Sequence, residues 1–468
     1  MRRTGVALRW AGVLCAALVA GLALSCGGGS PGATPTPSAT SSPSPAPDTA
    51  TPAPPQTAYR FVWRQFGATE DTILRVAPDN PGQPETLAVV PHREGYGIKP
   101  SLSPDQELLA YVTYPESAYD ASFQSDLYVL DLKTKEAKFI TGQVDLHFKP
   151  LWSPDSRLLY VRRNIGQQVM VLQVKAPRTP KEGEPTPTPT PSPPPDQTPA
   201  PTEDPVRVAM EESVSRVLSF TPVGFADDGR SMFFVQVQGG TGGGTLLGEY
   251  APATWEAVTK ADAEAAAAQR AYEEAVQAAI AAGAPPPEPL PTPAPRTKLV
   301  ADLTDQIASD FALSPDAHKF AFLAPQLVEG SEPGSVEIRA RVWWTDLGTT
   351  ATSPLPIDNL PPGDFLRPAW YPDSSRLTVG LLPADGRPGK LLTVPVAGGM
   401  PELLPTEASG YDVPVSWAPD GSYIAVIRDS GTSIGTPSRR RLVFVSPAGH
   451  RLDSGEGHDL EPLGWVQP

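Results

Sequence analysis

Cysteine is almost absent from this chain of 468 residues, which contains 2, Cys15 and Cys26, both near the N-terminus. The rest of the sequence therefore has no disulfide framework, no cysteine nucleophile and no cysteine-based zinc site. Histidine is also scarce, and no pair of histidines has a metal-binding spacing such as His-x-x-x-His; the five are His92, His147, His318, His450 and His458. We expect no metal, no cofactor and no catalytic residue that the sequence alone can name.

Positive charge is in short supply as well. The chain has 37 Lys and Arg against 52 Asp and Glu, a formal net charge of −15. A nucleic-acid partner needs clustered Lys and Arg to neutralise phosphates, so this balance argues against one. We interpret the acidity as a contribution to solubility.

The N-terminal stretch contains a long apolar run, Trp10–Leu24, preceded by Arg2, Arg3 and Arg9. At fifteen residues the run is short for a membrane span, and its layout is that of a secretory signal. The sequence Leu22-Ala23-Leu24-Ser25-Cys26 resembles a bacterial lipobox. The resemblance implies removal of residues 1–25, lipidation of Cys26 and a bacterial cell-membrane location facing the outside or the periplasm. The alternative is an ordinary signal peptide with an incidental cysteine.

Proline, with 59 residues, is concentrated in three segments that cannot pack into a core. Residues 26–57 read as a disordered tether and 176–204 as a disordered insertion. A second insertion, 252–296, contains Trp255–Ala282, an Ala- and Glu-rich stretch that ends at Gly283 and predicts an α-helix. A narrow seam repeats every seven residues along it, so the helix either stands alone or pairs with a partner; the seam is Val258, Ala265, Tyr272 and Ala279.

A short pattern recurs along most of the chain. Its clearest copy, Val413–Arg428, reads as a strand, a Pro-Asp-Gly turn and a second strand, which predicts a β-hairpin. The copies centre on Asp105, Asp155, Asp228, Asp316, Asp373 and Asp420. The intervals are 50, 73, 88, 57 and 47 residues, and removing the two insertions reduces the second and third to 44 and 43. This near-uniform period indicates a repeat unit of four strands, A to D.

The two ends of the chain supply one more unit. Glu461–Pro468 matches the A strand of the clearest copy, whereas Tyr59–Val90 offers three strands without an A strand. We therefore predict an all-β fold spanning 58–468: a single β-propeller of seven four-stranded blades, closed by both termini, plus the inserted α-helix. Six or eight blades are the alternatives if one hairpin is miscounted.

The turn chemistry supports this reading, because Pro presets φ, Asp suits the next position and Gly adopts a left-handed conformation without strain. Only Gly229 and Gly421 meet the last demand. Other residues stand there in four copies, namely Gln106, Ser156, Ala317 and Ser374. Those turns either differ or carry about 1 kcal/mol of strain each.

With their aromatic-Ser-Pro-Asp-Gly hairpins, the copies resemble the WD40-like repeats of TolB-type propellers. Trp152-Ser153-Pro154-Asp155 and Trp417-Ala418-Pro419-Asp420-Gly421 match best. The resemblance implies the fold without implying a particular function. TolB has an additional N-terminal α/β domain and six blades, so its role is not carried over.

Three basic residues, Lys99, Lys149 and Arg367, each precede a proline at the start of an A strand. By propeller symmetry all seven A-strand starts surround one end of the central channel, which we call the mouth face; the opposite end, with the Pro-Asp turns, is the turn face. Positive charge on the mouth face favours an anionic ligand or a partner's carboxylates. Alternatively, these are ordinary charges paired with Asp310 and Glu461. The neighbouring connections add further candidates: Tyr96, His147, Tyr411, Asp412 and His458.

Three functions fit these features. The first is a lipid-anchored propeller that binds an unknown protein or glycan through the mouth face, with no catalysis of its own. The second is a lyase or hydrolase that uses His, Tyr and carboxylates at the mouth, and the third is a structural scaffold of the cell envelope. Gly431-Thr432-Ser433-Ile434-Gly435 has the Gly-x-Ser-x-Gly pattern of a nucleophile elbow, but it falls between two predicted strands rather than before a helix, so we interpret it as a turn.

Overall fold

The structure is a computed structural model that describes 53–115, 124–163, 168–175, 207–213, 220–226, 231–237, 244–250, 255–290, 297–329, 335–357, 362–434, 439–456 and 460–467. The expected signal peptide, the lipidation site Cys26, most of the expected tether and the insertion 176–204 lie outside these residues. We describe only the unit that begins at Pro52.

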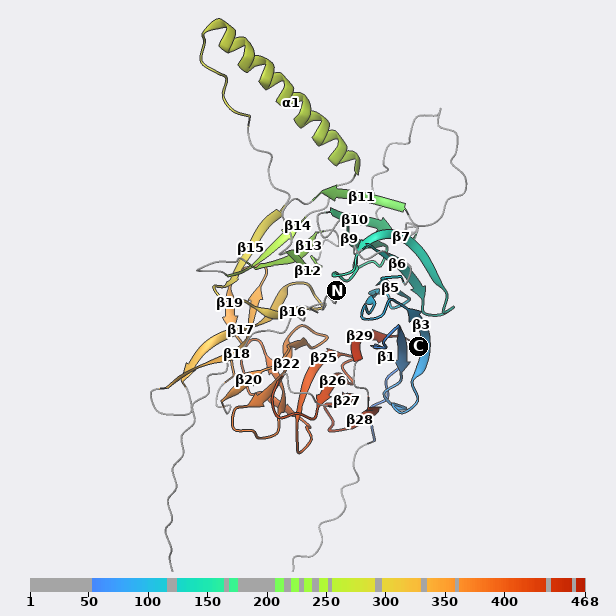
Figure 1. The fold of residues 1–468 in the computed structure, drawn as a ribbon. Helices are drawn as coiled ribbons and strands as arrows, with labels where there is room; N and C mark the ends of the chain where they lie inside the picture. Colours follow the sequence, from blue (N-terminus) through green and yellow to red (C-terminus); the bar gives the residue numbers. More distant parts are fainter. Residues whose placement is uncertain are drawn as a thin grey trace, which may run out of the picture. The chain divides into compact units, whose positions relative to one another are not determined.

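The described strands form a ring of seven antiparallel blades, as predicted (Figure 1). Blade 1 contains β4 (Lys99–Leu102), β5 (Leu108–Thr113), β6 (Gln124–Asp131) and β7 (Ala137–Asp145). Blade 2 contains β8 (Leu151–Trp152), β9 (Leu158–Arg163), β10 (Gln168–Gln173) and β11 (Arg207–Ser213). A single β7–β9 pairing joins these two blades into one 8-stranded sheet.

The next three blades occupy the middle of the chain. Blade 3 contains β12 (Phe220–Phe225), β13 (Met232–Val237), β14 (Thr245–Tyr250) and β15 (Thr297–Thr304). Blade 4 contains β16 (Ser309–Leu313), β17 (Lys319–Glu329), β18 (Val336–Asp346) and β19 (Thr352–Pro354). Blade 5 contains β20 (Gly363–Phe365), β21 (Ala369–Trp370), β22 (Arg376–Pro383), β23 (Lys390–Pro395) and β24 (Glu402–Leu404). Its A strand is thus split into β20 and β21, on either side of Pro368, which has no N–H for the ladder.

The last two blades close the ring. Blade 6 contains β25 (Tyr411–Trp417), β26 (Ile424–Asp429), β27 (Arg440–Val445) and β28 (Arg451–Glu456). Blade 7 combines the C-terminal β29 (Leu460–Val466) with β1 (Arg60–Gln65), β2 (Glu70–Val76) and β3 (Glu85–Pro91). In its sheet the order is β29-β1-β2-β3, and Phe61 faces Trp465 across the closing pair. The predicted closure by both termini is confirmed.

The Pro-Asp turns are left-handed at the position that sequence analysis singled out. Gly421 has φ +70°, and the four non-glycine residues also have positive φ: Gln106, Ser156, Ala317 and Ser374. The two serines among them offset the backbone strain with a hydrogen bond. The Ser156 hydroxyl accepts the N–H of Asp105 at 2.8 Å, and the Ser374 hydroxyl accepts the N–H of Asp316 at 3.2 Å. Each such bond ties a turn to the turn of the preceding blade.

Tryptophans at the ends of A strands provide a second connection between blades. The indole N–H of Trp152 donates to the Ser101 carbonyl of blade 1 at 3.0 Å, and Trp370 donates to the Ala312 carbonyl of blade 4 at 2.9 Å. These hydrogen bonds satisfy the polar atom of an otherwise buried aromatic side chain. The aromatic position of the repeat is therefore a blade-to-blade contact.

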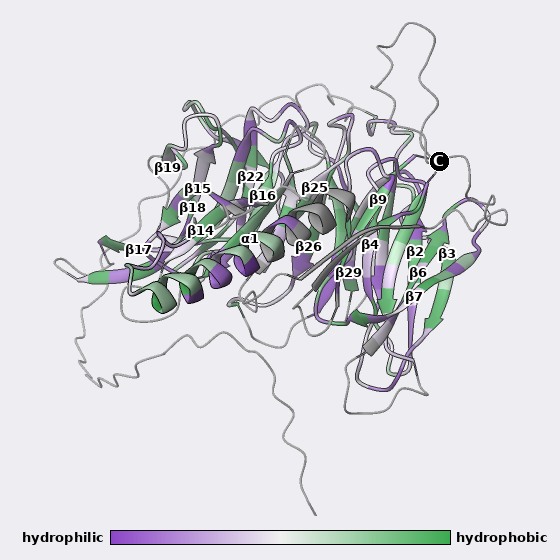
Figure 2. Ribbon diagram, turned by 90° about the horizontal axis from the view of Figure 1, so that it is seen from above, coloured by the Kyte–Doolittle hydropathy of each residue, from purple (hydrophilic) through white to green (hydrophobic). Residues whose placement is uncertain are grey.

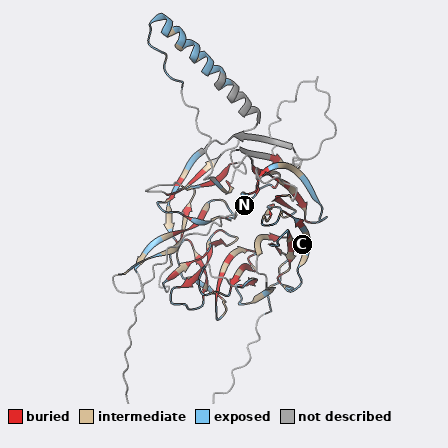
Figure 3. Ribbon diagram, viewed as in Figure 1, coloured by how far each residue is buried: buried red, intermediate tan, exposed pale blue. Residues whose placement is uncertain are grey.

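The apolar core lies between the blades. One cluster joins Phe61 and Trp63 of blade 7 to Tyr423 and Phe444 of blade 6. Figure 3 shows buried segments within the blades and exposed segments toward the outer strands. Figure 2 shows apolar residues running along the strands.

The predicted helix is confirmed as α1 (Trp255–Ala282). It ends in a Schellman motif: Gly283, at φ +62°, donates its N–H to Ile280 at 3.2 Å, and Ala284 donates to Ala279 at 2.9 Å. Of the described side chains on α1, Tyr272, Val276 and Ala279 are half-buried and the others are exposed. The helix follows β14 and precedes β15, so it is inserted between the third and fourth strands of blade 3.

Candidate binding site at the mouth face

Glu461, at the start of the A strand of blade 7, gathers two cations. Its carboxylate forms an ion pair with Lys149 of blade 2 and a second with Arg64 Nη2 at 2.8 Å. The Arg64 side chain is 2% exposed and that of Lys149 is 51% exposed. Blade 1 lies between blades 2 and 7, so this ion pair joins two blades that are not adjacent in the ring. The alternative interpretation, in which such charges pair with Glu461, holds for Lys149.

Lys99, in blade 1, belongs to the same group of charges. Burial lowers the pKa of its ammonium from the ordinary value; Glu461 opposes this shift, whereas Arg64 and Lys149 add to it. Lys99 itself makes no ion pair or side-chain hydrogen bond with any residue that the structure describes. We call this group (Arg64, Lys99, Lys149 and Glu461) the cation cluster. Its three cations face two carboxylates, Glu461 and the buried Asp71, so an excess of positive charge remains and favours a further anion.

A buried network holds Arg64 in place. Its guanidinium donates to the Ile98 carbonyl, lies 3.4 Å from Asp71 and stacks on Phe66 at 3.8 Å. Asp71 in turn accepts the N–H groups of Gly67 and Ile98 at 3.0 and 2.9 Å. Such fixed surroundings preorganise a cation without the entropy cost of ordering a flexible side chain.

Arg64 was not predicted from the sequence. It lies in the second strand of blade 7, and no repeat position marks it as basic. The signal was the closure itself, because the register of β1 with β29 places Arg64 opposite Glu461.

The other basic residue of the pattern, Arg367, lies in blade 5 and is exposed. It has no ion pair within the described ranges, and it does not join the cation cluster. Tyr96 is half-buried and packs its ring against Tyr114 with centroids 4.9 Å apart. His147 is exposed, and its backbone N–H donates to Asp145 at 2.9 Å.

Asp412 and Tyr411 have structural contacts instead: Asp412 pairs with arginines of its own blade 6, and Tyr411 packs against Leu366 and Leu382 of blade 5. Asp412 is fully buried, accepts two hydrogen bonds from Arg451 at 2.9 and 3.1 Å, and lies 3.6 Å from Arg428. Tyr411 is buried too, and burial, together with Asp429, raises its pKa to about 12. Neither side chain is presented to a ligand. The last candidate, His458, lies outside the described residues.

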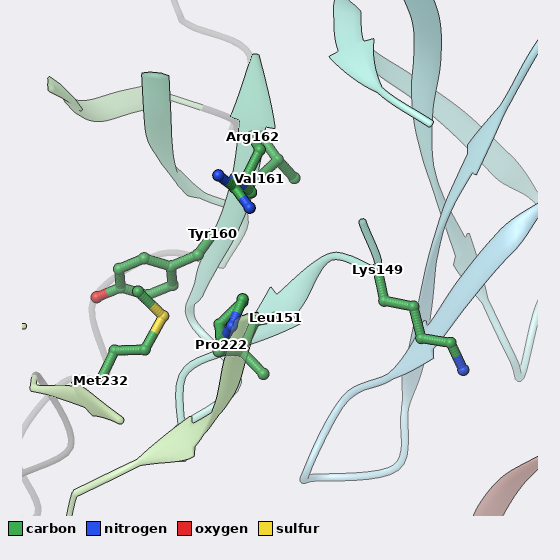
Figure 4. Close-up of a pocket in the computed structure, with 7 residues that line it drawn as sticks. All are labelled: Lys149, Leu151, Tyr160, Val161, Arg162, Pro222 and Met232. Atoms are coloured by element: carbon green, nitrogen blue, oxygen red, sulfur yellow. The ribbon is translucent and has the colours of Figure 1, made fainter. Parts of the chain in front are cut away.

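A crevice adjoins the cation cluster between blades 2 and 3. The residues that line it are Lys149, Leu151, Tyr160, Val161, Arg162, Pro222 and Met232 (Figure 4). The Arg162 guanidinium stacks on Phe148 at 3.8 Å. Lys149 thus belongs both to this crevice and to the cation cluster.

In the part of the chain that the structure describes, no group of three or more His, Cys, Asp or Glu side chains is arranged to hold a metal ion. Among the same residues, no helix is both long and apolar enough to cross a membrane. Ser433 lies in the loop between β26 and β27, and the Gly-x-Ser-x-Gly pattern therefore does not sit at a strand-to-helix turn.

Comparison with known proteins gives structural matches only. No family model matches the chain. No curated protein matches it either. TolB from Acinetobacter baumannii is similar at 15% identity and a TM-score of 0.40, over 87% of this chain and 66% of that one. The β-propeller domain of the Trilobed protease from Pyrococcus furiosus is similar at 11% identity and 0.46, over 86% and 97%.

Oligogalacturonate lyase in complex with manganese is similar at 13% identity and a TM-score of 0.44, over 84% of this chain and 82% of that one. This chain thus spans 66% of the TolB chain and most of the other two. At such identities and scores we draw nothing about activity from these proteins.

Proposed function

We propose that this protein is a lipid-anchored, extracytoplasmic binding module that holds an anionic protein or glycan partner on its mouth face. The observation that supports it is the cation cluster, where Lys99 is half-buried, has no described ion-pair partner and stands beside Arg64 and Lys149. An incoming anion would replace water around Lys99 and compensate the cost of its burial. Arg367 is exposed too, but it lies in the break between β20 and β21 rather than at the start of the A strand of blade 5.

The position of residues 55–57, at the start of the propeller, is compatible with binding on the mouth face. Thr57 donates to Asp420 at 2.7 Å, and the Tyr423 hydroxyl donates to the Pro55 carbonyl at 2.7 Å. Asp420 is part of a Pro-Asp turn, so Pro55 and Thr57 lie against the turn face and leave the mouth face uncovered by this segment. Lipidation of Cys26 is part of the proposal.

Charge reversal tests the binding surface. The partner is first captured by crosslinking on intact cells, and its affinity is then measured for the variant Lys99→Glu, Lys149→Glu, Arg367→Glu. We expect a loss of at least about tenfold, strongest at low salt. The matched control reverses three exposed lysines elsewhere, Lys133→Glu, Lys138→Glu and Lys298→Glu. Unchanged affinity of the first variant for every captured partner contradicts the proposal.

Anchoring is tested separately. We expect globomycin to block processing, and Cys26→Ser to release the protein from the membrane fraction. A Cys26→Ser protein that stays membrane-bound and processes normally would rule out the lipid anchor.

A further inference from the structure

The crevice between blades 2 and 3 has an unusual charge balance for an apolar site. Five of its lining residues are uncharged, two are cationic and none is acidic. Leu151, Pro222 and Met232 supply apolar walls, and Met232 is 2% exposed. Arg162 supplies the positive charge of the crevice, whereas the ammonium of Lys149 points away from it and pairs with Glu461 (Figure 4). A ligand that complements this lining carries a negative group beside a small apolar group.

Arg162 is the better-positioned of the two cations. It is buried, with its guanidinium held against Phe148. Burial lowers its pKa, and the nearby Asp145 opposes that shift only in part. A planar carboxylate can meet a guanidinium through two parallel hydrogen bonds, and this pairing is strongest where water is excluded.

The size of the crevice limits the apolar group. The crevice is partly open to solvent, and its cavity volume is about 10 Å³, close to what one water molecule needs. The thioether of Met232 adapts readily because three torsions rotate, so a methyl-sized group can be admitted. A large aromatic or branched side chain would require displacement of the wall.

The adjoining strand favours a peptide over a free acid. In the described part of the chain β8 pairs only with β9, so the other edge of β8 offers unpaired backbone groups. Leu151 of β8 lines the crevice. An extended peptide can add its backbone to such an edge while its end enters the adjoining pocket.

We propose that this crevice binds the C-terminal carboxylate of a peptide whose last side chain is small and aliphatic. The carboxylate pairs with Arg162, and the last methyl group contacts Met232 and Leu151. The inference rests on the proposed function, whose anionic partner it specifies as a peptide end.

Methionine methyl NMR of the mature chain tests the assignment. Met232 reports on the crevice, whereas Met400 is 92% exposed in blade 5 and serves as the internal reference. The probe is N-acetyl-Gly-Gly-Ala with a free carboxylate. We expect a saturable shift of the Met232 signal alone, and at least about tenfold weaker binding of the corresponding amide, since it loses a charge-assisted pair.

Further probes and one variant sharpen the outcome. We expect N-acetyl-Gly-Gly-Trp to bind more weakly than the alanine peptide, and Arg162→Lys to weaken binding of the acid about tenfold without moving the Met400 signal. Equal binding of acid and amide, or unchanged affinity in Arg162→Lys, overturns the carboxylate site. If N-acetylalanine binds as tightly as the tripeptide, the ligand is a free small acid and the peptide assignment is wrong.

The comparison of acid with amide uses the unaltered protein, so it decides the matter even if Arg162→Lys fails to fold. Failure here is distinct from failure of the proposed function. The charge-reversal variant leaves Arg162 intact and is assayed against the partner captured from cells, whereas the crevice is assayed with defined peptides.

Discussion

Trp465 donates its indole N–H to the carbonyl oxygen of Ser416, 3.1 Å away, and so fastens the last strand of the chain to blade 6. The same ring meets Phe61 of β1 edge to face, with centroids 5.1 Å apart. One side chain therefore connects the C-terminal strand both to the N-terminal strand and to the preceding blade.

Truncation of this side chain should weaken the ring closure. We expect Trp465→Ala to lower the free energy of unfolding by about 3–5 kcal/mol, because it removes a large buried ring. Trp465→Phe keeps most of the packing and should cost less. Urea denaturation measures both, with the exposed Met400→Ala as a control that should stay within about 0.5 kcal/mol. A Trp465→Ala protein as stable as this control would show that closure does not depend on the ring.

Glycine substitution should have different effects on stability at two equivalent left-handed turn positions. Ala317 has φ +57° and a side chain that makes no hydrogen bond, so Ala317→Gly should raise the free energy of unfolding by up to about 1 kcal/mol. Ser156→Gly relieves the same strain but loses the hydrogen bond from Asp105. Thermal unfolding should therefore show a gain for the first and no gain for the second. Equal gains would mean that the serine bond contributes nothing.

Low pH should lower the free energy of unfolding by protonating Glu85, which lies in β3 at the outer edge of blade 7. Hydrogen bonds from Lys135 and Arg75 lower the pKa of this carboxyl from 4.5 to about 2. Since the pKa in the folded state lies below that of the unfolded chain, the stabilisation is fully present above pH 4.5 and is lost as pH falls toward 2. We expect Glu85→Gln to be less stable than the parent at pH 6 and to approach it at pH 3. A constant difference across this range would contradict the assignment.

High pH should lower the free energy of unfolding through Tyr411. Its folded-state pKa of about 12 lies above the value near 10 of an exposed tyrosine, so the unfolded chain loses its proton first. Stability should therefore fall as pH rises from about 10 to 12. Tyrosinate absorbance should show at least one tyrosine that titrates late in the folded protein. Tyr411→Phe should reduce that late component while leaving the contribution of Tyr111, whose pKa burial also raises to about 12.

The fold was predictable because turn residues mark the ends of the strands in each copy of the repeat. Turn residues such as Asp420 and Gly421 mark each hairpin, and the unmatched A strand at Glu461 identifies the closure. Local turn chemistry is readable from sequence since it involves adjacent residues. The positive φ of Gln106 and Ser156 shows that the pattern holds even where glycine is absent.

The site was only partly predictable, because its partners are distant in sequence. Lys99 and Lys149 were found from their equivalent positions, but Arg64 becomes part of the cluster only through the pairing of β1 with β29. The burial of Asp412 beneath Arg451 depends on a residue of the last strand of the same blade, 39 positions away in the sequence. The position of a residue within the repeat predicts at which end of the ring it lies, whereas its exposure depends on side chains from distant strands.

The position of β1 in the middle of its blade has a mechanical consequence. The strand lies between β29 and β2, with hydrogen bonds on both edges. A pull applied through the N-terminal segment, while the domain is held at its mouth face, enters the domain at this strand and loads both ladders in shear. Force on the tether should therefore meet its greatest resistance at the seam where the ring closes, and that seam should set the rupture force in a single-molecule stretching experiment.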